Sequence, residues 1–73
     1  MSKVVCYDKL WKLLIDKKMT RTEMKNLSRI STASLAKLGK GENITTAILV
    51  KICEALECDI TEIMELVDDP AAK

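Results

Sequence analysis

The sequence predicts a single all-α domain of five short helices, and three observations predict this class. Apolar residues recur at spacings of three and four along most of the chain, which is the period of an amphipathic helix. Thr, Ser and Asp stand directly before several of these stretches, where they favour helix starts. The chain has 73 residues, 48% of them hydrophobic. We therefore expect one compact domain over residues 1–73, with an ordered core at about 7–67 and a short N-terminal arm.

The first helix is expected over about residues 7–18. Its inward candidates share one face and are Leu10, Leu13 and Leu14. Trp11 and Ile15 form a second apolar pair, one turn apart.

A second helix is expected to begin after Thr20. Thr20 followed by Glu23 is a capping box, in which the Thr hydroxyl accepts from the third helical N–H and the Glu reaches back to the cap. Met24 and Leu27, three residues apart, would form its buried side. Ser-Arg-Ile at residues 28–30 interrupts the pattern and indicates a tight turn.

A third helix follows this turn, with Ser31 as a suitable N-cap and Leu35 and Leu38 as its apolar pair. At about 100° per residue, the opposite face carries polar, basic and small side chains. These are Thr32, Ala33, Ala36, Lys37 and Lys40. Gly39 and Gly41 end the helix, because glycine tolerates the left-handed conformation that closes one.

Two short helices joined by a tight turn, over residues 20–41, are the organisation of a helix-turn-helix DNA reader. The same pattern also occurs in helical bundles whose polar faces are only solvated. That alternative stays open on pattern alone.

A fourth helix is expected over about residues 46–57, after a Thr45 cap. Its apolar stripe is Leu49, Ile52, Cys53 and Leu56. Asp59 followed by Glu62 is a second capping box, which predicts a fifth helix. The apolar face of that helix would be Ile60, Ile63, Met64 and Val67. The tail, residues 68–73, is expected to fray.

Charge is divided unevenly along the chain. The first 41 residues carry ten Lys or Arg and three Asp or Glu, a net charge of +7. The remaining 32 residues carry two Lys and eight acids, a net charge of −6. The overall charge of +1 therefore hides a dipolar molecule whose basic half contains the third helix. Such a half suits the phosphate backbone of nucleic acid, although solvated helix faces can also divide in this way.

The composition does not favour an enzyme, a cofactor or a metal site. There is no histidine, no nucleophile beside a base and no phosphate-cradling glycine loop. The three cysteines form no CxxC pair and cannot complete a zinc site. Apolar runs such as residues 47–50 are too short to span a membrane, and no secretory leader is present. We therefore expect a cytoplasmic protein.

The pattern TRTEM…ISTASLAKLGKGEN…TTAILVKICEALECDITEIMELV resembles the phage repressor/Cro-type helix-turn-helix family. The resemblance extends over residues 7–67, and the small single-domain bacterial regulators of that family are the most similar. It implies a compact, repressor-like DNA-binding domain that regulates transcription on double-stranded DNA. It also implies that no small-molecule effector domain is present.

The resemblance also implies roles for individual residues. Arg21 would contact a phosphate from the start of the second helix. Ser31 would cap the third helix and touch the DNA backbone. The groove-facing positions would be Thr32, Ala33, Ala36 and Lys37. Lys40 and Asn43, in the exit loop, would contact the backbone.

Three departures from the family pattern affect these roles. Arg29 stands where the turn normally has glycine, and a positive φ there would cost on the order of 1 kcal/mol. Lys25 stands where a small residue usually packs between the second and third helices, so its stem would have to snorkel along the surface. The two groove-facing alanines offer only apolar contacts, which leaves direct readout to Thr32 and Lys37.

So few polar readers favour binding as a homodimer or beside a partner regulator. The candidate dimer contacts are Trp11, Ile15, Met64, Leu66 and Val67. The same residues would serve equally well to complete a small, aromatic-poor core. A further alternative is an adapter that keeps the fold, modulates another regulator and reads no DNA. The acidic C-terminal half would then face that partner.

Overall fold

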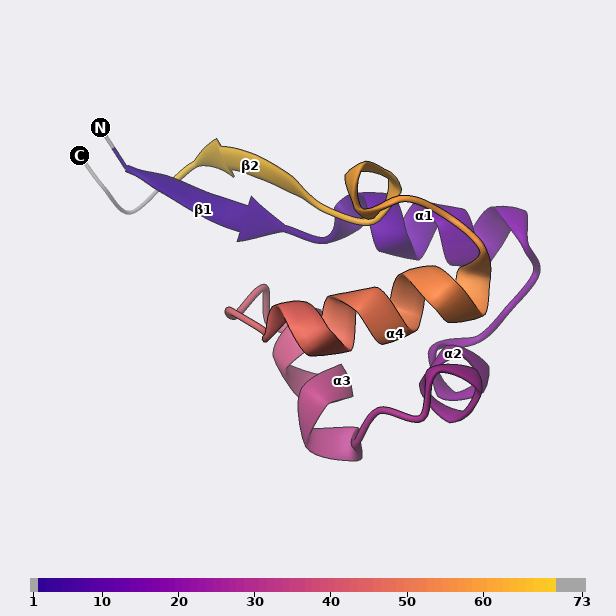
Figure 1. The fold of residues 1–73 in the computed structure, drawn as a ribbon. Coiled ribbons are helices and arrows are strands. Elements are labelled where there is room, and N and C mark those ends of the chain that lie inside the picture. Colours follow the sequence, from indigo (N-terminus) through magenta and orange to yellow (C-terminus); the bar gives the residue numbers. More distant parts are fainter. Residues whose placement is uncertain (1, 70–73) are drawn as a thin grey trace.

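Four α-helices, one 3₁₀ turn and a two-stranded antiparallel sheet make up the computed structural model, which describes residues 2–69 (Figure 1). The elements in chain order are β1 (Lys3–Cys6), α1 (Asp8–Asp16), α2 (Arg21–Ser28), α3 (Thr32–Gly39), α4 (Thr46–Leu56), η1 (Ile60–Glu62) and β2 (Glu65–Asp68). In Figure 1, α4 lies between α1 on one side and α2 with α3 on the other. None of the described helices has the length and apolar character needed to cross a membrane.

The predicted helix starts are confirmed by hydrogen bonds. Thr20 Oγ1 accepts from the Glu23 N–H at 3.1 Å, and Glu23 Oε1 accepts from the Thr20 N–H at 2.9 Å. Ser31 Oγ accepts from the Ser34 N–H at 3.0 Å at the start of α3. Thr45 caps α4 in the same way. Each cap satisfies a backbone donor that has no partner within its own helix.

The predicted fifth helix is wrong. Glu62 does accept from the Asp59 N–H at 2.7 Å, but this cap opens only the single turn η1. The chain then extends into β2, which runs antiparallel to β1 and places Val67 opposite Val4. The β-branched valines suit a pleated strand, and pairing between the two ends of the chain decides their conformation. The fold is therefore mainly helical with a small sheet, not all-α.

The chain ends also differ from the expectation. The residues expected as an N-terminal arm form β1, and Asp68, placed in the frayed tail, ends β2. Lys3 Nζ lies 2.6 Å from Asp68 Oδ1, and the Asp69 N–H donates to the Ser2 carbonyl at 3.1 Å. Residues 70–73 of the predicted tail lie outside the described part of the chain.

The core is aliphatic and draws on every helix. Its fully buried side chains are Leu10, Met24, Leu38, Ile52, Leu56 and Ile63. Tyr7 is also buried, and its hydroxyl donates to the Glu42 carbonyl at 3.0 Å. That bond ties the loop after α3 to the start of α1. Burial of the phenol also raises the pKa of Tyr7.

The prediction that Leu27 is buried is wrong. It is 54% exposed, whereas Met24 and Ser28 are buried. Met24 and Ser28 are four residues apart and share one face of α2, which packs against α4. Leu27 and Ser28 lie on opposite sides of Met24 around the helix, and the side that carries Ser28 is the one that is buried.

The Ser28 hydroxyl is buried and has no hydrogen-bond partner among the described residues. We predict that Ser28→Ala leaves the free energy of unfolding unchanged or raises it by about 0.5–1 kcal/mol, because an unsatisfied polar group is removed and Ala favours helix. Denaturant titration measures the difference.

Ser34→Ala is the matched control. The Ser34 hydroxyl is nearly buried but accepts from Ser31 Oγ at 3.0 Å, so this substitution should cost about 0.5–1.5 kcal/mol. Equal destabilisation by the two substitutions would contradict the unsatisfied state of Ser28.

Candidate nucleic-acid interface

The turn between α2 and α3 depends on Arg29. Arg29 has φ 60° and ψ 37°, the left-handed conformation, and ends α2. The Ile30 N–H donates to the Lys25 carbonyl at 3.2 Å, and the Ile30 side chain is buried. Ser31 is extended and starts α3. The turn therefore ends α2 and starts α3 within a few residues, and the buried side chain of Ile30 anchors it in the core.

One face of α3 is left free. Ser34 and Leu38, four residues apart, are buried, and Leu35 is half-buried against the core. The residues of the opposite face are all exposed and are Thr32, Ala33, Ala36 and Lys37. These are the four groove-facing positions expected from the sequence, and they form one continuous strip along the helix.

Arg21 is positioned at the start of α2 by two other helices. Its guanidinium carbon lies 3.9 Å from the centroid of the Trp11 ring on α1, within range of a cation–π interaction. Its Nη1 atom is so close to Gly39 that a Cβ added there would lie 3.4 Å from it. The side chain is thus held between α1 and the end of α3, and it remains exposed to solvent.

The exit loop of α3 carries two more predicted contacts. Lys40 ends the helix, and Gly41 follows with φ +71°, a left-handed conformation that favours glycine. The Glu42 N–H then donates to the Lys37 carbonyl at 3.0 Å. Lys40 and Asn43 are both exposed, so the loop presents them beside the free face of α3.

The cations of this region are not neutralised by ion pairs. Arg21, Arg29, Lys37 and Lys40 are exposed, and within residues 2–69 none of them lies within ion-pair distance of a carboxylate. The region can therefore offer these charges to an anionic partner. In the described part of the chain, no three His, Cys, Asp or Glu side chains are grouped so as to hold a metal ion.

Comparison with known proteins agrees with this geometry. The model of the Cro/C1-type HTH DNA-binding domain matches residues 9–69. The chain belongs to this Cro/C1-type family. The crystal structure of the transcriptional regulator VanUg (form II) superposes with a TM-score of 0.91 and is 42% identical in sequence, over 94% of this chain and 92% of that one. No curated protein compared with the chain matches it.

In the structure, α2, the turn at Arg29 and α3 lie in the segment that the sequence predicted as a helix-turn-helix. The strip on α3 follows from helical periodicity alone. The contact between Trp11 and Arg21 does not, because it requires α1 and the start of α2 to meet in space. No local pattern in the sequence indicates this contact.

The candidate dimer residues lie in two separate places. Trp11 is half-buried against the core and contacts Arg21, and Ile15, one turn away, is 74% exposed. Leu66 is 62% exposed on β2, where Val67 and the preceding Met64 are half-buried. Ile15 and Leu66 are therefore the two members of this set that present apolar surface to solvent.

Lys25 is accommodated without the small residue expected between α2 and α3. Its side chain is half-buried, and its carbonyl accepts the Ile30 N–H that closes the turn. A long aliphatic stem can cover apolar surface in this way while the charge stays in water.

The positive φ of Arg29 gives a stability prediction. Arg29→Gly should raise the free energy of unfolding by about 1 kcal/mol, because glycine adopts the left-handed conformation without the Cβ penalty. Chemical denaturation followed by circular dichroism measures this change.

Arg29→Ala is the matched control, since it removes the same charge and keeps the Cβ. It should give no gain in stability. Equal effects of the glycine and alanine substitutions would show that the turn carries no backbone strain.

Proposed function

We propose that this Cro/C1-type protein regulates transcription by inserting α3 into the major groove of double-stranded DNA. The observation that carries the proposal is the exposed strip on α3, flanked by cations that form no ion pair within residues 2–69. A helix fits the major groove, where each base pair presents a distinct pattern of donors and acceptors. The likeness to VanUg, a transcriptional regulator, supports a role in transcription regulation.

The flanking residues would position the domain on the phosphate backbone. Arg21 reaches the backbone from the start of α2, and its stacking on Trp11 reduces the conformational freedom lost on binding. Lys40 and Asn43 reach it from the exit loop, and Ser31 from the N-terminus of α3. Contacts of this kind give affinity and register but carry little sequence information.

Sequence would be read mainly by Thr32 and Lys37. The Thr32 hydroxyl can donate or accept, and the Lys37 ammonium can donate to guanine O6 or N7. Ala33 and Ala36 add apolar contact, for example with a thymine methyl. Two polar readers give a thin code, so specific binding requires further base pairs from a second domain.

We therefore propose that the protein binds as a dimer, or beside a partner regulator, across two half-sites. In such domains the half-sites lie about one helical turn apart, roughly 34 Å. Ile15 and Leu66 offer the exposed apolar surface for a second copy, with Trp11, Met64 and Val67 beside them.

Selection of bound sequences from a random DNA pool tests this proposal. We expect enrichment of a palindrome whose half-site centres are about 10–11 base pairs apart. Enrichment of a single half-site would contradict the dimer. An unenriched pool, together with no duplex binding at low salt, would contradict DNA reading and favour an adapter.

Lys37→Ala tests the reading helix itself. Loss of a base contact should weaken binding to the selected site by about 10- to 100-fold and relax the preference at one base position. Lys40→Ala should weaken binding to all DNA sequences about equally. It should also reduce the slope of log affinity against log salt concentration by about one. Fluorescence anisotropy over a range of salt concentrations measures both effects.

Lys12→Ala is the matched control, because Lys12 is an exposed lysine on α1 and lies outside the proposed interface. It should leave affinity within about twofold at moderate salt. Equal losses for Lys12→Ala and Lys37→Ala would indicate general charge attraction without docking of α3.

A further inference from the structure

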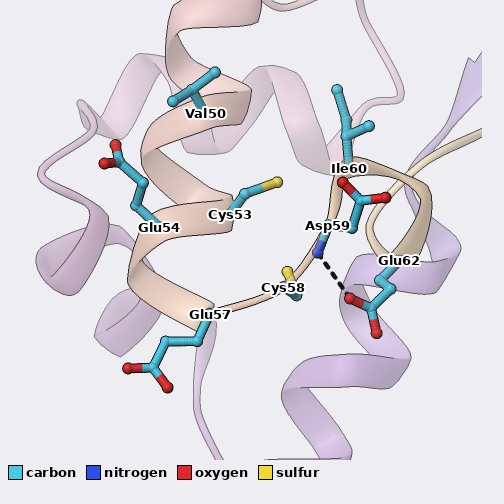
Figure 2. A pocket seen from close by; sticks show the side chains of 8 residues that line it. All are labelled: Val50, Cys53, Glu54, Glu57, Cys58, Asp59, Ile60 and Glu62. Atoms are coloured by element: carbon cyan, nitrogen blue, oxygen red, sulfur yellow. Dashed lines mark hydrogen bonds between the residues drawn. The ribbon is translucent and has the colours of Figure 1, made fainter.

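A groove of about 620 Å³ lies between the C-terminal half of α4 and the segment that leads through η1 (Figure 2). It is lined by Val50, Cys53, Glu54, Glu57, Cys58, Asp59, Ile60 and Glu62. None of these residues belongs to the proposed DNA interface. The groove is therefore a surface separate from that interface, and DNA binding gives it no role.

The floor of the groove is apolar and open to solvent. Val50 is 54% exposed and Ile60 is 38% exposed, although each is a large hydrophobic residue. Cys53 and Cys58 are half-buried between them, and both thiols are free. Burial raises the pKa of Cys58 to about 11 and also raises that of Cys53, so both thiols are uncharged at neutral pH.

The rim of the groove is acidic. Glu54 and Glu57 project from α4, while Asp59 and Glu62 come from the opposite side (Figure 2). Within residues 2–69, no Lys or Arg lies within ion-pair distance of any of these four carboxylates. The positive charge of Lys17 acts on Cys58, at the floor, without forming an ion pair. The exposed apolar floor is thus bordered by four carboxylates that form no ion pair within residues 2–69, although Lys51 lies near Glu54 and Lys9 near Glu62.

We propose that this groove binds a basic amphipathic segment of another protein, with apolar side chains on the floor and Lys or Arg against the rim. An amphipathic helix laid in an apolar groove is a common recognition mode. A neutral apolar segment would desolvate the rim carboxylates without replacing their hydration, whereas Lys and Arg would compensate them.

A second copy of this chain fits the groove less well. In a symmetric contact the grooves of the two copies would face each other, and their acidic rims would repel. Contact with the basic half of another copy would be head-to-tail, which forms open chains unless the rotation closes. Charge complementarity therefore favours a basic partner of a different kind.

The proposal does not rest on DNA binding, because its residues and those of the DNA interface do not overlap. If both surfaces are used, a protein bound to DNA through α3 still presents the groove to a partner. The chain would then connect an operator to a second protein without any additional domain.

NMR titration of the ¹⁵N-labelled full chain provides the test. The probe is a synthetic 18-residue peptide with Leu at helical spacings of three and four and Lys elsewhere. We expect chemical-shift changes centred on residues 50–62. The same peptide with Glu in place of Lys should bind at least about tenfold more weakly, because each rim contact would become repulsive.

Two double substitutions separate the rim from general charge. Glu54→Gln with Glu57→Gln should weaken binding of the Lys peptide by about tenfold. Glu42→Gln with Glu65→Gln removes two exposed acids outside the groove. This pair should change the affinity for the Lys peptide by less than about twofold. Neither pair lies in the core, so both variants should keep the fold, which their spectra will show directly.

Several outcomes would overturn the proposal. These are shift changes centred elsewhere, equal weakening by the two double substitutions, and equal binding of the Glu and Lys peptides. A fourth is a concentration-dependent dimer in sedimentation that Val50→Asn abolishes, because a second copy would then occupy the groove. DNA affinity of the Glu54→Gln, Glu57→Gln variant should stay within about twofold at moderate salt, so a failure here is distinguishable from a failure of DNA reading.

Discussion

Burial of the apolar stripe of α4 is the interaction on which the rest of the structure depends. Leu49, Ile52 and Leu56 place α4 at the centre of a core that includes side chains from α1, α2 and α3, and Ile63 directly after η1. Because the chain has no phenylalanine, aliphatic side chains and Met24 must fill this space. A small domain buries a smaller share of its surface than a large one, so each of these contacts has a large effect on stability. The free face of α3 exists only because its opposite face is fixed here.

Much of the helical part follows from local sequence. The caps at Thr20, Ser31 and Thr45 fix where three helices begin, and periodicity then fixes which side of α3 is free. Arg29 stands where the family turn normally has glycine, and its φ of 60° shows that the turn keeps the left-handed conformation there. These features depend on residues within one or two turns of each other, which is why the sequence alone predicts them.

The features that the sequence does not predict are those that join distant segments. The Asp59 capping box fits a helix and a single 3₁₀ turn equally well, and only pairing with β1, some sixty residues away, favours extension after η1. Stacking of Arg21 on Trp11 similarly needs α1, α2 and the end of α3 to be in place. The groove beside α4 is also a tertiary feature, because its two sides meet only after the chain turns back at Glu57 and Cys58.

The pairing of β1 with β2 affects the order in which the domain folds and the place where its two chain ends leave it. The register partners Lys3 and Asp68 are almost a whole chain length apart, so the loop-closure entropy must be overcome before their contacts stabilise the sheet. A two-stranded sheet is marginal without such support. We therefore expect the strands to form after the helices and to open before them, while α2 and α3 remain in place. Because the paired strands run antiparallel, a polypeptide attached to either end would leave the domain at the same edge.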